Sequence, residues 1–448
     1  MRHLVVSGDA SAPVYMVENR SNGPWQDVEI VVGGRYRATQ TQLEPNGGVT
    51  LSPAVLFDPV TVSRENIDAT VVKVPVPAIE DPTDAMAPLW DKLAAIARGE
   101  ARDHVRVAFY GDSNMTRDYI TGAMRRVLQG RFGDAGHGFV ALSRPWGWYA
   151  HMDVRHGTSG EKHWRYIATS THYIRDHLYG FANIGAESSR PGANAWVQTA
   201  EDGAPVGAKV SAFDLLFLTQ PYGGQFEILV DDQVVRTVST RAGANAAGFE
   251  RVEVPDGPHK LSCRVKGYGP VRLFGAALER AASPSVVVDS LGVGALNYEQ
   301  MLHVEGSTRR AMLAHRKYDL VVFLLGTNMF APHAHEEWVK GALADFRAAL
   351  PGVPVLLMSP PDSGVTNRDW TSNPRIEKLA IQMREIARTT GAAYWDFWAA
   401  MGGKGSIRRF MENHLAENDC VHLSPGGGQL MGARFAHALL RGAEAHAK

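Results

Sequence analysis

An apolar stretch that runs into a glycine turn constrains this 448-residue chain more than any other feature. The stretch covers residues 105–110 and is followed by Gly111, Asp112 and Ser113, after which apolar residues recur with helical spacing at Ile120 and Met124. This pattern predicts a buried strand, a turn and a helix that starts close to Ser113. The first N–H groups of a helix lack partners within it and form its positive dipole end. A serine hydroxyl there could attack a carbonyl, with N–H donors beside the developing oxyanion.

Strand and helix patterns alternate again toward the C-terminus. Apolar strand-like segments cover residues 285–290, 319–325, 353–358 and 392–397. An amphipathic helix is predicted at residues 374–390, and a last helix at 424–440 with Ser424 as its N-cap and Pro425 at its first position. Apolar strands that alternate with helices predict an α/β fold with a parallel sheet covered on both faces. Polar residues should then gather at the carboxyl ends of the strands.

Two other regions are rich in strand signals. Residues 1–82 contain short strand-like segments and end in a proline-rich stretch at 74–82. Residues 155–283 include a hairpin pattern at 225–240, where Asp231-Asp232 joins two apolar runs. We therefore expect an N-terminal β-sandwich-like domain over 1–82 and an inserted β-sandwich over 155–283. The α/β domain would consist of residues 83–154 and 284–448.

Composition excludes several classes of protein. The 46 Lys and Arg residues balance 47 Asp and Glu residues, for a net charge of -1, so no basic surface for nucleic acid is expected. No apolar run reaches the roughly 18–20 residues that span a bilayer, and the first residues show no secretory signal pattern. Cys263 and Cys420 fit no zinc spacing, and two buried thiols are favoured over a disulfide. The compartment and the oligomeric state stay open.

The loops at the predicted strand ends supply the residues of an acyl-transfer site. Ser113 is a weak nucleophile until an imidazole takes its proton, and His422 could do so while Asp419, three residues upstream, orients the ring. The backbone N–H groups of Ser113 and Gly294 and the side-chain amide of Asn328 could form an oxyanion hole. No metal or organic cofactor is needed for this chemistry.

These four blocks, G-D-S, a glycine after a strand, G-x-N and D-x-x-H, occur in that order. The chain resembles the SGNH (GDSL-type) hydrolases from about residue 85 to its C-terminus, around the insert. The resemblance implies a three-layer α/β/α fold, Ser113, Asp419 and His422 as catalytic residues, and Gly294 and Asn328 in the oxyanion hole. Gly292 is the alternative block-two glycine. Asn114 stands where Leu is usual, and Met329 follows Asn328 where Asp is common.

A finer resemblance rests on Gly133–Phe139 (GDAGHGF), the inserted β domain, residues 288–295 and Met401-Gly402-Gly403. Together they look like the peptidoglycan O-acetylesterase branch, which carries a carbohydrate-binding-module-like insert. The resemblance implies an esterase that removes O-acetyl groups from O-acetylated peptidoglycan in the periplasm or outside the cell. An acetylated carbohydrate polymer would then be the partner.

Alternatives remain at this stage. The chain could be a carbohydrate O-acyltransferase, an esterase acting on xylan or lipids, or a carbohydrate-binding protein on a silent scaffold. Trp146, Trp148 and Tyr149 could stack on a sugar or simply pack in the core. His333 could lie at the substrate-binding lip, and a metal site with His335 is disfavoured. His137 is expected to be a hydrogen-bonding loop residue.

Overall fold

The computed structural model describes residues 74–201, 204–281, 284–331, 335–366 and 369–447, together with five short strands before residue 64. Those strands are β1 (Tyr15–Glu18), β2 (Trp25–Val32), β3 (Tyr36–Leu43), β4 (Gly48–Leu51) and β5 (Val62–Ser63). β1 pairs with β4, and β3 pairs with β2 and β5. Most of the predicted N-terminal domain lies outside the described residues.

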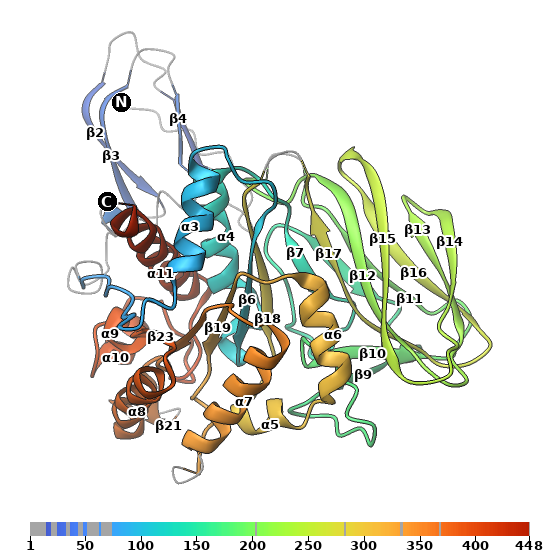
Figure 1. Ribbon diagram of the computed structural model, residues 1–448. Helices are drawn as coiled ribbons and strands as arrows, with labels where there is room; N and C mark the ends of the chain where they lie inside the picture. The colour runs from blue at the N-terminus through green and yellow to red at the C-terminus, as the bar shows by residue number, and fades with distance from the viewer. Residues whose placement is uncertain are drawn as a thin grey trace.

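A five-stranded parallel sheet forms the centre of the molecule (Figure 1). Its spatial order is β18-β6-β19-β20-β23. The strands are β6 (Val105–Gly111), β18 (Val286–Gly292), β19 (Leu320–Leu324), β20 (Val355–Met358) and β23 (Ala393–Trp395). Along the chain this is the order 2-1-3-4-5, so the winding direction reverses between β6 and β19. Ligands of doubly wound sheets bind at such a reversal, beyond the carboxyl ends of the strands.

Helices cover both faces of the sheet, as predicted (Figure 1). Alternate residues of β6 explain why: Val107 and Phe109 enter the core on one face, while Ala108 and Tyr110 enter the core on the other. The first face carries α3 (Ala87–Ala97), α4 (Tyr119–Phe132), α9 (Phe397–Met401), α10 (Ser406–Glu412) and α11 (Pro425–His446). The second carries α5 (Tyr298–Leu302), α6 (Gly306–Arg316), α7 (His335–Ala349) and α8 (Pro374–Thr390). A small hairpin, β21 (Gly364–Thr366) and β22 (Asp369–Ser372), precedes α8.

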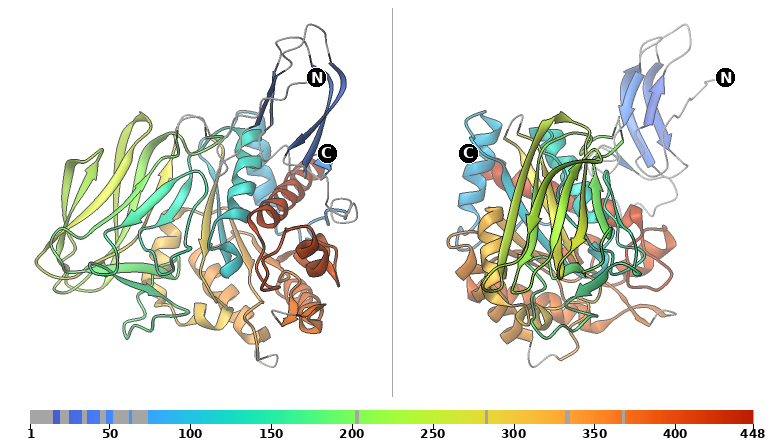
Figure 2. Two further views of the ribbon diagram at one scale, coloured as in Figure 1. Left: turned by 180° about the vertical axis from the view of Figure 1, so that it is seen from behind. Right: turned by 90° about the vertical axis from the view of Figure 1, so that its right-hand side faces the viewer.

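Beside this domain stand two antiparallel sheets, which Figure 2 shows from behind and from the side. One has the order β15-β12-β17-β10-β9, with β7 also paired to β17, and the other has the order β14-β13-β16-β11-β8. The strands are β7 (Gly138–Ala141), β8 (Arg155–Thr158), β9 (Arg165–Ala168), β10 (Ile184–Ser188), β11 (Asn194–Gln198), β12 (Val210–Thr219), β13 (Gln225–Val230), β14 (Gln233–Ser239), β15 (Ala246–Gly257), β16 (Lys260–Gly267) and β17 (Val271–Glu279). The predicted hairpin is present: Asp231 and Asp232 both have positive φ, 48° and 64°.

The hydrogen bonding of β7 ties the sandwich to the parallel sheet. β7 lies before the predicted insert boundary at residue 155, yet it pairs with β17. The Phe139 N–H donates to the buried Asp289 carboxylate on β18 at 2.8 Å. Arg316 on α6 bonds both Asp289 and Glu279 of β17. β7 is thus held beside the middle of β18.

Two smaller expectations concern the thiols and membrane insertion. Cys263 and Cys420 are both buried and are not joined by a disulfide, as predicted. Within the described ranges, none of the helices combines the length and the apolar character that a bilayer crossing requires.

Candidate active site

The turn at the end of β6, which carries Ser113, differs in one respect from the prediction. Ser113–Met115 forms a single 3₁₀ turn, and the next α-helix, α4, begins only at Tyr119. The predicted helix is present with Ile120 and Met124 buried, but it begins after this 3₁₀ turn and not directly at Ser113. The 3₁₀ turn is closed by the Asp112 side chain, which accepts a hydrogen bond from the Asn114 N–H at 3.0 Å. Gly111 is required here, because a Cβ atom would lie 2.1 Å from the Met115 side chain.

The loop before α11 brings an imidazole and a carboxylate to this serine. His422 Nε2 lies 2.7 Å from Ser113 Oγ, although the two residues are 309 positions apart. His422 Nδ1 lies 2.5 Å from Asp419 Oδ2. The other carboxylate oxygen of Asp419 accepts the backbone N–H groups of Val421 and His422, both at 3.0 Å. The three predicted catalytic side chains therefore form one continuous hydrogen-bonded chain.

Electrostatics favour an ionised Asp419 beside His422. Partial burial alone would raise the pKa of Asp419, but hydrogen bonds from the His422 ring and from two backbone N–H groups lower it to about 2. The hydrogen bond to Asp419 raises the pKa of His422 above its usual value, against the effect of burial. A carboxylate on Nδ1 fixes the neutral ring as the tautomer whose Nε2 can accept the serine proton.

Gly294 and Asn328 line the same cavity, of about 660 Å³, as Ser113, Asp419 and His422. Asn328 follows β19, and its Nδ2 donates to the Leu296 carbonyl at 3.4 Å, which leaves the second N–H of the amide for another acceptor. Gly292, the alternative block-two glycine, is the last residue of β18 and packs against the Met115 backbone. Of the two candidate block-two glycines, Gly294 is therefore the one that lines the cavity.

Two tryptophans form one wall of this cavity. Trp146 and Trp148 stack with their ring centroids 6.5 Å apart and an interplanar angle of 22°. Trp148 is 50% exposed, whereas Trp146 is half-buried and lies against Gly294, where an added Cβ would be 3.2 Å from its ring. Tyr149, grouped with them in the sequence, is buried and packs in the core.

A buried polar cluster supports the tryptophan loop from below. His151 Nδ1 lies 3.0 Å from His137 Nε2, and His151 Nε2 lies 2.9 Å from the Tyr149 hydroxyl. Asp118, at the N-cap of α4, accepts the Met152 N–H at 3.1 Å and pairs with Arg125 at 2.9 Å. Asp118, His137 and His151 could approach one cation, but the Arg125 guanidinium already neutralises the carboxylate.

Of the two histidines near the Asn328 loop that the sequence analysis names, the structure describes only His335. His333 lies outside the described residues, so its place at the substrate lip stays a prediction. His335 is buried at the start of α7, and its Nδ1 lies 3.4 Å from Gln382 Oε1.

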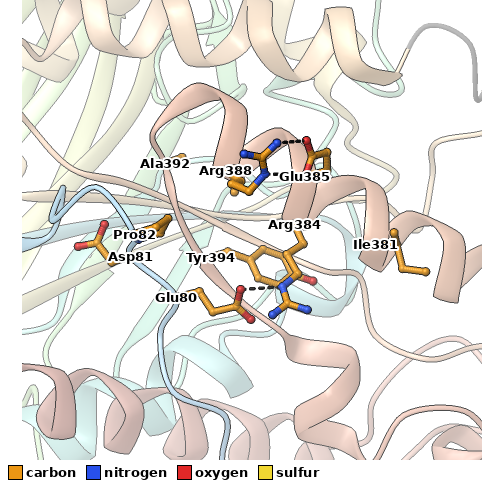
Figure 3. A pocket seen from close by; sticks show the side chains of 10 residues that line it. Glu80, Asp81, Pro82, Ile381, Arg384, Glu385, Arg388, Ala392 and Tyr394 are labelled. Atoms are coloured by element: carbon orange, nitrogen blue, oxygen red, sulfur yellow. Dashed lines mark hydrogen bonds and ion pairs between the residues drawn. The ribbon is translucent and has the colours of Figure 1, made fainter.

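A second cavity, of about 800 Å³, lies between residues 80–82 and α8 (Figure 3). Its dominant features are ion pairs: Arg384 with Glu80 at 2.6 Å and Arg388 with Glu385 at 2.5 Å. The backbone of Glu80 also forms an isolated antiparallel β-bridge with Tyr394, which covers the outer edge of β23. Among the described residues that line this cavity there is no serine, cysteine or histidine, so these residues offer no nucleophile–base pair.

Comparisons with known proteins bear on the family and the fold of the chain. A sequence model of the GDSL-like lipase/acylhydrolase family matches residues 259–430, a range that contains Gly294, Asn328, Asp419 and His422. No curated protein sequence shows significant similarity to the chain. A solved peptidoglycan O-acetylesterase has the same fold, with a TM-score of 0.68 and 22% identity over 82% of this chain and 99% of that one. A family two carbohydrate esterase from Cellvibrio japonicus is only weakly similar, with a TM-score of 0.26 and 11% identity over 66% of this chain and 99% of its own. Taken with the fold, these findings show that residues 259–430 match the GDSL-like lipase/acylhydrolase family and that the chain has the fold of the peptidoglycan O-acetylesterase.

Proposed function

We propose that the chain is a serine esterase that removes O-acetyl groups from a carbohydrate polymer, with O-acetylated peptidoglycan as the first candidate. The observation that carries this proposal is the hydrogen-bonded chain from Asp419 through His422 to Ser113, which opens into the cavity that Gly294 and Asn328 line. The stacked Trp146 and Trp148 give this cavity an aromatic wall of the kind that suits the apolar face of a sugar.

In the first half of the reaction, Ser113 Oγ attacks the acetyl carbonyl carbon while His422 Nε2 takes its proton. The tetrahedral oxyanion accepts hydrogen bonds from the Ser113 and Gly294 N–H groups and from the Asn328 amide. The bond between the acetyl carbon and the sugar oxygen then breaks, and that oxygen leaves with the proton from His422. The product of this half-reaction is an acetyl ester on Ser113.

In the second half, water attacks the acetyl-Ser113 carbonyl carbon and gives its proton to His422. The bond from the carbonyl carbon to Ser113 Oγ breaks, and the serine recovers the proton from His422. Acetic acid leaves and gives up its remaining proton to the solvent. Asp419 stays ionised throughout, because its pKa is held at about 2.

Acetate release from O-acetylated peptidoglycan, acetylated xylan and 4-nitrophenyl acetate tests the proposal. We expect release from all three to depend on Ser113, with the highest kcat/KM on peptidoglycan. Ser113→Ala should abolish release while the folded state persists, and retained activity would refute the assignment of the nucleophile. A higher kcat/KM on acetylated xylan than on peptidoglycan would make xylan, and not peptidoglycan, the candidate substrate. If more acetyl groups are found on a sugar acceptor than are released as acetate, the reaction is acyl transfer and not hydrolysis.

A further inference from the structure

The loop that carries Asn328 is held from outside by a single guanidinium. Arg375 Nη1 donates to the carbonyl of Met329 at 2.6 Å, and its Nη2 donates to the carbonyl of Thr327 at 3.0 Å. These carbonyls belong to the residues on either side of Asn328. A planar guanidinium can bridge two acceptors with fixed geometry, which a single ammonium point charge cannot do. Both backbone neighbours of the amide are therefore clamped by one side chain.

Arg375 is itself well anchored. It is the second residue of α8, which begins at Pro374, and the Asn373 side chain caps the helix by accepting the Arg375 N–H at 3.0 Å. Its guanidinium lies over the Phe330 ring, 4.5 Å from the centroid. Burial lowers the pKa of Arg375, and no carboxylate of the described residues contributes to that shift. Among the described residues, the guanidinium donates to the two loop carbonyls and forms no ion pair.

Two hydrogen bonds that Asn328 itself makes are longer. Asn297 Nδ2 donates to the Asn328 carbonyl at 3.4 Å, and Asn328 Nδ2 donates to the Leu296 carbonyl at the same distance. An oxyanion donor is effective only if it is already oriented when the charge develops, because reorientation costs free energy during the reaction. The two hydrogen bonds from Arg375, at 2.6 and 3.0 Å, are shorter than both of these.

We infer that Arg375 is a positioning residue for the oxyanion hole, which acts through Asn328 and does not touch the substrate. The inference rests on the proposed function, because it gives the Asn328 amide its role. If Arg375 only stabilised the fold, its loss would lower the free energy of unfolding and leave turnover by the folded fraction unchanged. If it orients Asn328, its loss lowers kcat.

The test is a double-mutant cycle with Arg375→Ala and Asn328→Ala, measured with 4-nitrophenyl acetate and normalised to active sites by titration with a phosphonate. We expect Arg375→Ala to lower kcat about 10-fold with KM within twofold, a fraction of the cost of losing a donor outright. In the Asn328→Ala background the same change should cost less than twofold, because the group it orients is gone. Arg384→Ala on the same helix, whose guanidinium pairs with Glu80 in Figure 3, should keep wild-type kcat.

Several outcomes would overturn the inference. They are an unchanged kcat in Arg375→Ala, a full additional loss in the Asn328→Ala background, or an equal loss in Arg384→Ala. If Arg375→Ala does not fold, Arg375→Lys replaces it in the cycle, with an expected kcat loss of about threefold that again disappears without Asn328. A wild-type chain with no Ser113-dependent turnover would overturn the proposed function as well, and that result is separate from any result on Arg375.

Discussion

The side-chain oxygen of Asn114 accepts a hydrogen bond from the backbone N–H of Leu423 at 2.8 Å. Asn114 follows Ser113, the proposed nucleophile, in the 3₁₀ turn, and Leu423 follows His422, the proposed base. Two segments that are 309 residues apart are thus joined one residue away from the Ser113–His422 contact. The bond is buried, so water does not compete for its donor or its acceptor. It fixes the distance over which the serine proton must move.

Asn114→Ala should therefore impair catalysis more than binding. Loss of a buried hydrogen bond that leaves the Leu423 N–H unpaired costs about 1–3 kcal/mol of unfolding free energy. Looser alignment of Ser113 and His422 should lower kcat by about 10-fold, with little change in KM for a small acetyl ester. Steady-state kinetics and urea unfolding measure the two effects. The exposed Asn245→Ala in the β-sandwich is the matched control, and wild-type kcat in folded Asn114→Ala would contradict the alignment role.

The pH dependence of turnover should reflect His422. The hydrogen bond to Asp419 raises the pKa of His422 above its ordinary value of 6.5, and only the neutral ring can accept the serine proton. We expect kcat/KM to rise with pH through an apparent pKa above 6.5 and then to level off. Asp419 should add no second step near neutrality, because its own pKa is about 2.

Asp419→Asn tests whether the loss of activity at low pH comes from protonation of His422. Without the carboxylate the pKa of His422 loses its main upward cause, so the acid limb should move to lower pH. The plateau rate should fall by about 10⁴-fold because the ring is no longer held in the right tautomer. An acid limb that stays in place in Asp419→Asn would assign it to another group.

The sequence was sufficient to place the candidate site because of one property of parallel sheets. Their strands all end at the same edge, so the loops with Ser113, Gly294 and Asn328 had to meet wherever the five strands paired. The partners of Asn114 and Arg375 were not predictable in this way. Each bonds backbone atoms of a distant loop, and a backbone N–H or carbonyl leaves no residue-specific signal in the sequence. The same limit applies to β7, whose pairing with β17 depends on the register of the sandwich.

The contact between Trp146 and Gly294 predicts selectivity for short acyl groups. The indole lies directly against the glycine whose N–H we propose as an oxyanion donor, so it limits the space beside the carbonyl carbon. Trp146→Ala should raise the ratio of kcat/KM for 4-nitrophenyl butyrate over acetate by about 10-fold, as expected for a pocket enlarged by a few methylene groups. Trp148→Ala, at the exposed partner of the stack, should leave that ratio unchanged and weaken activity on the polymer. If wild type and Trp146→Ala show the same ratio of kcat/KM for butyrate over acetate, Trp146 does not determine the acyl chain length.

The buried cluster beneath the tryptophan loop should make stability sensitive to acid. Burial lowers the pKa of His151 to about 4, so the folded chain resists protonation that the unfolded chain accepts at about 6.5. The unfolded state then binds more protons between these values, and the free energy of unfolding falls as pH drops from about 6.5 toward 4. Burial shifts His137 and His156 in the same direction.

In His151→Asn, the fall in the free energy of unfolding between pH 7 and pH 4.5 should be smaller by about 1–3 kcal/mol. The substitution also lowers stability at pH 7, because it breaks the hydrogen bonds to His137 and Tyr149. Urea unfolding at both pH values gives the slope, with the exposed His172→Asn as control. An unchanged slope in His151→Asn would assign the acid sensitivity to other groups. The measurement also separates two effects of acid on the enzyme, because protonation of His422 lowers turnover without unfolding, whereas protonation of the cluster lowers the folded fraction.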